Sequence, residues 1–279
     1  MTETTTLVLG ATGKTGRRVA ERLVGAGKSV RIGSRSTLIP FDWERPSTWA
    51  PVLRGVGAAY VSFQPDLAVP GALQTVGEFF KQAIAAGVEK LVLLSGRGEP
   101  EAQDAETALQ DTGADWTILR ASWFNQNFSE NFFLEPLLAG EVALPATLAA
   151  EPFVDVDDIA EIAAAALTSN AHSRRLYELT GTEAITFPEA IDQIARASGR
   201  TIAYTPVSMD DYRAELVRQQ VPTGYIDLVM YLFGTVLDGR NTPVTDGVEQ
   251  GLGRPARRFS DYVQQTAATG VWGDSRVGA

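Results

Sequence analysis

Three glycines near the start of the chain are spaced in a pattern that can bind phosphate groups. Gly10, Gly13 and Gly16 follow the apolar segment 5–9 and precede segment 17–24, in which apolar residues recur at helical spacing. In such a unit the first glycine makes a tight turn, the second lets the backbone approach a pyrophosphate, and the third lets helix and strand pack closely. The N–H groups and the dipole at the helix start favour the anion. The pattern therefore predicts a dinucleotide-binding βαβ unit.

Two other interpretations of this stretch are weaker. Gly13-Lys14-Thr15 also occurs in P-loop NTPases, but a P-loop needs a glycine five residues before Gly13, where Val8 stands. An ordinary structural turn does not explain the strand before it and the helix after it. The residues that we expect to contact the cofactor here are Gly10, Thr12, Gly13, Lys14, Thr15 and Gly16.

The segment after the second predicted strand, 29–32, indicates which dinucleotide is bound. NAD-binding proteins usually carry an acidic residue near the end of this strand for the ribose 2′-hydroxyl, whereas NADP-binding proteins carry basic residues for the 2′-phosphate. No acidic residue occurs from Lys28 to Phe41, and Ser34 and Arg35 stand at the strand end. A guanidinium there can clamp a phosphate, although Arg35 could also be ordinary surface. The sequence therefore predicts NADP(H) as the cofactor.

Further candidate residues follow predicted strands at their carboxyl ends, where open α/β sheets bind ligands. Asp42 is placed to hydrogen-bond an adenine amino group, and Phe63 and Gln64 follow the fourth strand beside the cofactor. Ser95 follows the fifth strand and is expected near the nicotinamide. These four residues extend the predicted cofactor site across the edge of the sheet.

The segment after the sixth strand, 121–128, is rich in aromatic and amide side chains for a loop. Core filling explains some of the rings, but amides between them at the end of a strand indicate a pocket wall. We therefore expect Trp123 and Asn127, together with Ser95, to form the catalytic site. The apolar residues of segment 225–233 could roof this cleft or simply fill a core.

The elements that position these residues alternate between strands and helices. The predicted strands are 5–9, 29–32, 38–43, 58–62, 90–94, 116–120 and 176–179. The predicted helices between them are 17–24, 46–53, 70–86, 101–110 and 159–167. This alternation predicts an α/β fold, a Rossmann doubly wound parallel sheet.

The last third of the chain changes character. Helices are predicted at 187–197, 208–219 and 226–237. We therefore expect residues 1–182 to form the Rossmann NAD(P)-binding core and residues 183–279 to form a smaller, mainly helical C-terminal substrate lobe.

Composition excludes several classes of protein. The chain has 279 residues, a net charge of −10 and no cysteine, which argues against nucleic-acid binding and against thiolate chemistry. The one histidine, His172, lies in a polar turn and is expected at the surface, so a histidine-based metal site is not predicted. The carboxylates of segment 155–158 are interpreted as the start of a helix rather than as a metal site. No signal peptide or membrane span is seen, which predicts a cytoplasmic protein, monomeric or homodimeric, with a small-molecule substrate.

Taken together, these features resemble the NmrA-like atypical short-chain dehydrogenase/reductase family over nearly the whole chain. Segments 41–43, 123–128, 153–160 and 253–257 are similar to the subgroup that contains ergot-alkaloid reductases and bacterial relatives. The resemblance implies a Rossmann fold, NADP(H) held by the glycine turn and Arg35, and a substrate cleft beneath the C-terminal lobe. It does not fix an activity, because the family includes reductases, isomerase-like enzymes and redox sensors without turnover.

The chain departs from ordinary short-chain dehydrogenases in its acid–base residues. Those enzymes use a tyrosine with a lysine four residues later, which lowers the pKa of the phenol. None of the 7 tyrosines here has lysine at that position. Many relatives also have a helix lysine two residues before a glutamate, where this chain has Asp104 before Glu106. Reduction by that dyad is therefore not expected.

Three hypotheses follow from this departure. The first is an NADPH-dependent reductase of an imine or iminium, an enone or a quinone, in which hydride delivery needs geometry more than a strong acid. The second is a sensor of the NADPH/NADP ratio without turnover. The third is a redox-neutral cyclase or isomerase that keeps the cofactor as a scaffold.

Overall fold

The computed structural model describes residues 4–145 and 148–273, and the chain forms two compact units. Unit 1 consists of Met1–Ala121, Val156–Leu179 and Asp246–Arg254. Unit 2 consists of Ser122–Asp155, Thr180–Thr245 and Pro255–Ala279. The predicted boundary between residues 182 and 183 separates a cofactor domain from a substrate lobe, and this functional division stays a prediction.

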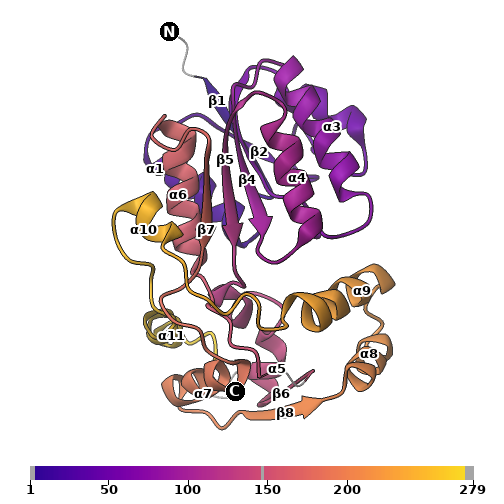
Figure 1. The fold of residues 1–279 in the computed structure, drawn as a ribbon, viewed down its shortest axis with the longest axis vertical. Helices are drawn as coiled ribbons and strands as arrows, with labels where there is room; N and C mark the ends of the chain where they lie inside the picture. Colours follow the sequence, from indigo (N-terminus) through magenta and orange to yellow (C-terminus); the bar gives the residue numbers. More distant parts are fainter. Residues whose placement is uncertain (1–3, 146–147, 274–279) are drawn as a thin grey trace. The chain divides into compact units, whose positions relative to one another are not determined.

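Within the described residues, unit 1 contains a parallel sheet of six strands in the order β2-β1-β3-β4-β5-β7 (Figure 1). The strands are β1 Thr5–Leu9, β2 Val30–Gly33, β3 Val56–Val61, β4 Lys90–Gly96, β5 Asp115–Ala121 and β7 Arg175–Leu179. The chain passes from β1 to β2 on one side and then to β3 on the other, so the switch point lies between the carboxyl ends of β1 and β3. The predicted doubly wound parallel sheet is confirmed.

Helices cover both faces of this sheet. They are α1 Lys14–Gly25, η1 Pro46–Thr48, α2 Trp49–Leu53, α3 Ala72–Ala85, α4 Pro100–Gln110, α6 Val156–Thr168 and α10 Gly247–Leu252. Helix α1 packs against α6, and α3 packs against α4, on opposite sides of the strands (Figure 1). The fold is thus the three-layer arrangement that the alternating pattern predicts.

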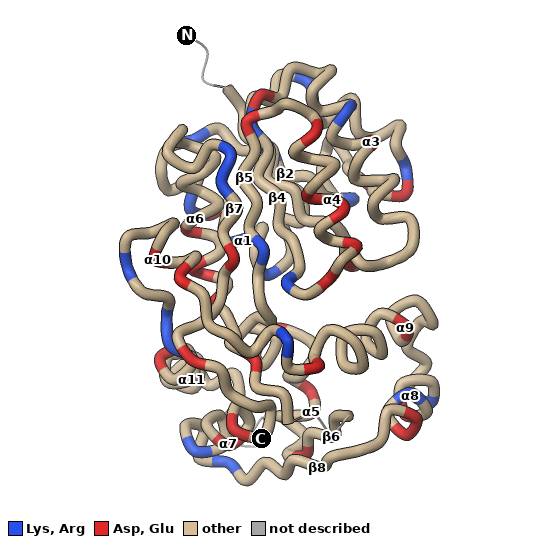
Figure 2. Tube along the Cα trace, viewed as in Figure 1, with Lys and Arg blue, Asp and Glu red and all other residues tan. Residues whose placement is uncertain are grey.

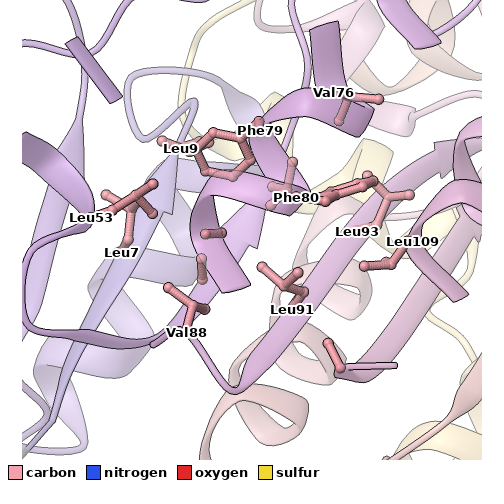
Figure 3. Close-up of a cluster of buried hydrophobic side chains, with 14 of the residues drawn as sticks. Leu7, Leu9, Leu53, Val76, Phe79, Phe80, Val88, Leu91, Leu93 and Leu109 are labelled. Atoms are coloured by element: carbon pink, nitrogen blue, oxygen red, sulfur yellow. The ribbon is translucent and has the colours of Figure 1, made fainter. Parts of the chain in front are cut away.

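The core of unit 1 follows from the two-residue period of its strands. Leu7 and Leu9 of β1 and Leu91 and Leu93 of β4 are fully buried and pack in one cluster with Phe79 of α3 (Figure 3). Residues two apart in a strand share a face, so these leucines form a layer against the helices. This layer anchors the strands whose carboxyl ends carry the candidate site residues.

Segment 38–43 is not a strand, so that prediction is wrong. Pro40 has no N–H to give to a ladder, and the N–H of Phe41 donates to the Ser34 carbonyl at 3.0 Å, which closes a loop after β2. Leu38 is fully exposed, whereas Phe41 stacks in an aromatic cluster with Trp49. The apolar residues of the segment therefore serve a turn and the core instead of a sheet.

Unit 2 is mainly helical. Its elements are η2 Asn125–Phe128, α5 Leu134–Ala139, β6 Glu141–Pro145, α7 Phe187–Ser198, β8 Ala203–Val207, α8 Met209–Arg218, α9 Thr223–Tyr231, the π-helical η3 Leu232–Val236 and α11 Phe259–Ala268. Three of these helices agree with the predicted ones. The parallel pair β6–β8 was not predicted, because each strand is short and its partner lies far away in the sequence.

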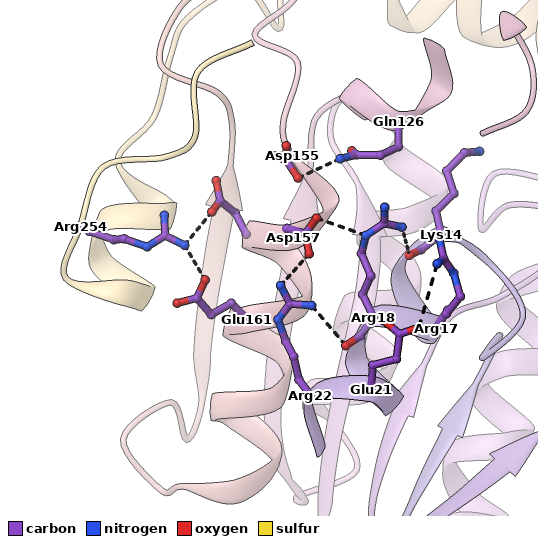
Figure 4. Close-up of polar contacts among 11 residues, drawn as sticks. Lys14, Arg17, Arg18, Glu21, Arg22, Gln126, Asp155, Asp157, Glu161 and Arg254 are labelled. Atoms are coloured by element: carbon purple, nitrogen blue, oxygen red, sulfur yellow. Dashed lines mark hydrogen bonds and ion pairs between the residues drawn. The ribbon is translucent and has the colours of Figure 1, made fainter. Parts of the chain in front are cut away.

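Ion pairs fix α6 within unit 1. Asp157 accepts hydrogen bonds from Arg18 at 3.2 Å and Arg22 at 2.6 Å, and Arg254 pairs with Asp158 and Glu161 (Figure 4). Both aspartates lie in the first turn of α6, which confirms that these carboxylates start a helix. Acidic and basic positions are interspersed along both units (Figure 2).

The surface position predicted for His172 is wrong. The residue is only 8% exposed, and its Nδ1 shares a hydrogen bond with the Tyr177 hydroxyl at 2.9 Å. Its carbonyl accepts from the Thr117 hydroxyl of β5. Burial lowers the pKa of His172. A polar turn is buried here because it packs onto β5 and β7.

Candidate functional site

The glycine turn has the geometry that its spacing predicts. Gly10 has a φ of +65°, which favours glycine, and its carbonyl accepts from the N–H of Gly13 at 2.8 Å. Gly16, in the first turn of α1, lies so close to this turn that a Cβ there would overlap the Gly10 carbonyl. A Cβ at Gly10 would press on Ser62, just after β3. The turn is therefore packed against the switch point of the sheet.

The start of α1 is suited to an anion. No side chain caps it, and no acidic residue lies in its first turn. A helix start without such caps offers N–H groups and a partial positive charge to a ligand. Thr12 in the turn is exposed, Lys14 is half-buried and Thr15 is buried. These are the features that the diphosphate of a dinucleotide would use.

Ser34 and Arg35 lie in the turn that follows β2, beside the strand that carries the glycine turn. Arg35 is exposed, and the Ser34 carbonyl accepts from the Thr37 hydroxyl at 2.8 Å. This places a guanidinium at the carboxyl edge of the sheet without an acidic residue in the turn. The position agrees with a role in binding a 2′-phosphate.

Asp42 lies in the loop beyond this turn. Its carboxylate accepts from the N–H of Glu44 at 3.1 Å and from Arg45 at 3.0 Å. The Glu44 N–H above all lowers the pKa of Asp42, and Arg45 and Arg35 contribute. Asp42 is therefore a fixed, charged acceptor on the Arg35 side of the candidate site. Its predicted contact with adenine stays a prediction.

Phe63 and Gln64 follow β3, next to the glycine turn. The ring of Phe63 is half-buried against Trp43, with their centroids 4.9 Å apart, whereas Gln64 is exposed. The loop therefore has an anchored aromatic residue and a free amide at the switch point. This is the arrangement expected of a loop that borders a ligand.

Ser95 is held by a buried ion pair that sequence reasoning missed. Its hydroxyl donates to Glu106 Oε1 at 2.6 Å, and Arg120 donates to both oxygens of Glu106 at 2.9 and 2.5 Å. Because the hydroxyl proton is already donated, Ser95 has only lone pairs to offer a ligand. Ser95 is thus an acceptor and not an acid in this arrangement.

The pair continues across the sheet. Arg120 of β5 approaches Glu178 of β7 at 3.5 Å, and Glu178 pairs with Arg97 at 2.7 Å. Ser95, Arg120 and Glu178 occupy one register row of β4, β5 and β7. The signal in the sequence was a charged residue inside each of two apolar strands, since a buried charge needs a partner.

Trp123 and Asn127 belong to unit 2. The indole of Trp123 packs edge-on against Phe187 and Phe233, with centroid distances of 5.5 and 5.3 Å. Asn127 is half-buried in η2, and its carbonyl accepts from the N–H of Phe133. Trp123 is therefore partly a core residue of its unit. Its predicted place beside Ser95, and that of Asn127, stay predictions.

The predicted apolar face of segment 225–233 is also largely core. Ile226, Val229 and Phe233 are buried in the hydrophobic cluster of unit 2, whereas Tyr225 is half exposed. Next to Trp123, the fully buried amide of Asn125 has no hydrogen-bond partner within the described chain. The residues near η2 are therefore mostly core residues, and the Asn125 amide is a buried polar group without a partner among the described residues.

Five of the tyrosines have pKa values raised by burial. They are Tyr60, Tyr177, Tyr204, Tyr212 and Tyr262. A catalytic tyrosine of a short-chain dehydrogenase needs the opposite change, which a neighbouring lysine supplies. The absence of a catalytic dyad stays a prediction.

Metal-binding clusters and membrane-spanning helices are both absent from the described residues. In residues 4–145 and 148–273, no group of three or more His, Cys, Asp or Glu side chains is placed to hold a metal ion. Over the same residues, no helix has the length and hydropathy to span a membrane.

Several known proteins are similar to this chain over nearly their whole length, although no family model matches it. It is 31% identical over 290 residues to (4-alkanoyl-5-oxo-2,5-dihydrofuran-3-yl)methyl phosphate reductase of Streptomyces griseus, covering 94% of this chain and 97% of that protein. It is 29% identical over 292 residues to agroclavine dehydrogenase of Claviceps fusiformis, covering 96% and 98%. An uncharacterized oxidoreductase of Bacillus subtilis, YesF, is 29% identical over 279 residues, covering 95% and 97%.

Solved structures share the fold at lower identity. The Escherichia coli NADPH-dependent quinone oxidoreductase, complexed with NADPH, has a TM-score of 0.77 at 20% identity, covering 94% of this chain and 99% of that one. Triphenylmethane reductase of Citrobacter sp., complexed with NADP(H), has a TM-score of 0.75 at 20% identity with the same coverage. NmrA, a negative transcriptional regulator, has a TM-score of 0.72 at 15% identity, covering 96% of each chain.

Proposed function

Because the chain belongs to the NmrA-like family of atypical short-chain dehydrogenases/reductases, we propose that it is an NADPH-dependent reductase of a small organic electrophile. The candidate substrates are an imine or iminium, an enone or a quinone. Relatives and fold neighbours named as reductases or dehydrogenases support this class, and their named substrates include an oxo-dihydrofuran and quinones. The cytoplasmic location and the monomeric or dimeric state stay predictions.

One observation carries the proposal: the glycine turn packs on the uncapped start of α1 at the switch point of the sheet. The residues fit a dinucleotide. Gly16 has no Cβ, so α1 can pack closely against the glycine turn, and the helix start offers N–H donors to a diphosphate. Arg35 supports NADP(H) over NAD(H), and two of the similar solved structures hold NADP(H) or NADPH. Gly10, Thr12, Gly13, Lys14, Thr15, Gly16, Ser34, Arg35, Asp42, Phe63, Gln64 and Ser95 would form the cofactor site.

When bound, NADPH supplies a hydride to an electrophilic carbon. We propose that Ser95, Trp123 and Asn127 position the reacting groups. The lone pairs of Ser95 would accept a hydrogen bond from the ligand, because its own proton is donated to Glu106. The indole of Trp123 would supply an apolar surface and Asn127 an amide. None of these three is an acid, so their contribution would be orientation.

Titration and turnover together test this function. NADPH binding is measured by fluorescence, and oxidation of NADPH is followed with iminium, enone and quinone compounds. Oxidation with any of these classes is expected. Tight binding without oxidation would instead support a redox sensor, and product formation without a change in NADPH absorbance would support a cyclase or isomerase.

Replacing Arg35 with alanine is expected to raise the Kd for NADPH roughly tenfold or more and to leave the Kd for NADH nearly unchanged. A charged hydrogen bond to a phosphate typically contributes about 1.5 to 3 kcal/mol. Fluorescence titration with both cofactors measures the two Kd values. Arg54→Ala is the matched control, because Arg54 is exposed and precedes β3 at the amino edge of the sheet. Equal affinity of the wild type for both cofactors would contradict the assignment.

Changing each tyrosine singly to phenylalanine is expected to leave measurable turnover on the substrate that the panel identifies. The seven variants concern Tyr60, Tyr177, Tyr204, Tyr212, Tyr225, Tyr231 and Tyr262. None has the lysine partner of the usual dyad, and five have raised pKa values. Steady-state kinetics measures the effect. A single position that abolishes chemistry while NADPH still binds would overturn the dyad-free interpretation.

A further inference from the structure

The carboxyl groups of Asp66 and Glu99 meet at the carboxyl edge of the sheet in unit 1. Asp66 lies after β3 and Glu99 lies between β4 and α4, and these two strands are neighbours. The Glu99 and Asp66 carboxyls lie close enough to interact directly, and Asp66 also accepts from the N–H of Ala68 at 2.8 Å. Carboxylates only accept hydrogen bonds, so this contact requires a proton on the pair.

Glu99 is buried in a position that packing alone does not explain. It is 6% exposed, and its Oε2 has no hydrogen-bond partner among the described residues. Glu99 precedes α4 as its N-cap, yet its side chain makes no capping hydrogen bond. The carboxyl lies instead against Gly96, where a Cβ would overlap it. A buried oxygen without a partner is costly, and a ligand group would satisfy it.

The charges around Glu99 keep it neutral. The two charged groups that act on it are Asp66 and Glu101, in the first turn of α4, and both are acidic. Burial, and then the charge of Asp66, raise the pKa of Glu99 to about 9. Burial also raises the pKa of Asp66. Two adjacent carboxyls, of which Glu99 is buried and Asp66 is partly buried, do not both ionise readily, so the pair holds a proton at neutral pH.

We propose that Glu99 is the proton donor of this reductase and that Asp66 positions the proton on it. The inference rests on the proposed function. Glu99 lies against Gly96, the last residue of β4, so the acid lies at the same strand end as Ser95 of the candidate site. It supplies the acid that Ser95 and the tyrosines do not, and a weak acid that stays protonated at the operating pH suits this role.

Hydride and proton reach the two ends of one substrate double bond. The substrate carbon accepts the hydride of NADPH, its double bond opens, and the electron pair moves to the far atom of that bond. This atom takes the proton of Glu99, whose O–H bond breaks and leaves its electrons on the carboxylate. The products are NADP⁺ and the reduced compound, and water returns a proton to Glu99 beside Asp66.

This acid favours one class of substrate. An enone or quinone becomes an anion when it accepts hydride, so it needs a proton from the site. An iminium ion becomes a neutral amine and needs none. Glu99 therefore assigns the site to neutral enones or quinones, in which proton and hydride are both delivered.

Kinetics of Glu99→Gln tests the assignment. We expect kcat for the enone or quinone to fall about 100-fold or more, with the Kd for NADPH unchanged and with iminium reduction, if it occurs, changed less than about twofold. Asp104→Asn is the matched control on α4, since Asp104 is exposed, and it should keep full activity. Asp66→Asn should move the alkaline limb of the kcat profile to lower pH, because it removes the charge that raises the pKa of Glu99.

Two measurements do not depend on turnover. The infrared spectrum of the wild type at neutral pH, minus that of Glu99→Gln, should show the C=O band of a protonated carboxyl. Because the pKa of folded Glu99, about 9, lies above the ordinary 4.5, this group stabilises the fold at low pH and loses that contribution as the pH rises through about 9. The free energy of unfolding of the wild type, relative to that of Glu99→Gln, should therefore fall as the pH rises from about 4.5 to about 9.

A second variant guards against misfolding. Gly96→Ala keeps both carboxyl groups in the chain, but its Cβ would push the Glu99 carboxyl out of its position. This variant should therefore lower kcat on the same substrates without changing the affinity for NADPH. If Glu99→Gln has the kcat of the wild type although the wild type shows the infrared band, Glu99 is not the proton donor, and the proposed reductase function still stands. No oxidation of NADPH by the wild type would overturn the proposed function, while absence of the band would overturn the shared proton independently.

Discussion

Replacing Glu106 with alanine is expected to lower the free energy of unfolding by about 3 to 5 kcal/mol. The Glu106 side chain is only 3% exposed and accepts from Ser95 and Arg120. Removing it leaves the partly buried guanidinium without its main partner, and the desolvation cost of that charge is no longer offset. Urea unfolding followed by circular dichroism measures the difference.

Asp104→Ala is the matched control, because Asp104 lies on the same helix and is exposed. Its effect should stay within about 0.5 kcal/mol. Glu106→Gln keeps the shape and one acceptor oxygen, so its stability should lie between those of the wild type and Glu106→Ala. If Glu106→Ala unfolds at the same urea concentration as the wild type, the buried pair does not contribute to stability.

Replacing Gly16 with alanine is expected to raise the Kd for NADPH by about tenfold to 100-fold. Its Cβ would overlap the backbone carbonyl of Gly10, so the turn must move away from α1. Overpacking typically costs about 1 to 3 kcal/mol, and each 1.4 kcal/mol that falls on binding corresponds to roughly a factor of ten. Fluorescence titration measures the affinity.

Gly25→Ala controls for the substitution itself. Gly25 lies in the same helix with no atom near its Cβ position, so alanine there should leave cofactor affinity unchanged and raise helix stability by about 0.5 to 1 kcal/mol. An unchanged affinity in Gly16→Ala as well would mean that the turn does not hold the diphosphate.

Features whose signals are local can be predicted from the sequence. The glycine turn, the strands on both sides of it and the helix after it depend on residues within one short stretch, so spacing predicts them. Helix α7 is a second case. Thr186 and Glu189 form a capping box at its start, and Gly199 ends it with a φ of 67°.

Where local signals competed with packing, the sequence misled. Segment 38–43 has the apolar character of a strand, but Pro40 would interrupt the hydrogen bonds of a sheet. Phe41 packs instead against Phe79 in the aromatic cluster. His172 sits in a polar turn, and β5 and β7 cover it. Both outcomes depend on neighbours that are distant in the sequence.

The acid and the buried ion pair of the candidate site were decided only by the tertiary structure. Ser95 and Glu106 are 11 residues apart, and Arg97 and Glu178 are 81 apart. The register of β5 and β7 places Glu178 beside Arg120, and no local pattern encodes that register. Likewise, Glu99 at the start of α4 is buried against Gly96, with Asp66 of the loop after β3 as its neighbour. Burial beside another carboxyl, a property of the folded chain alone, raises the pKa of Glu99.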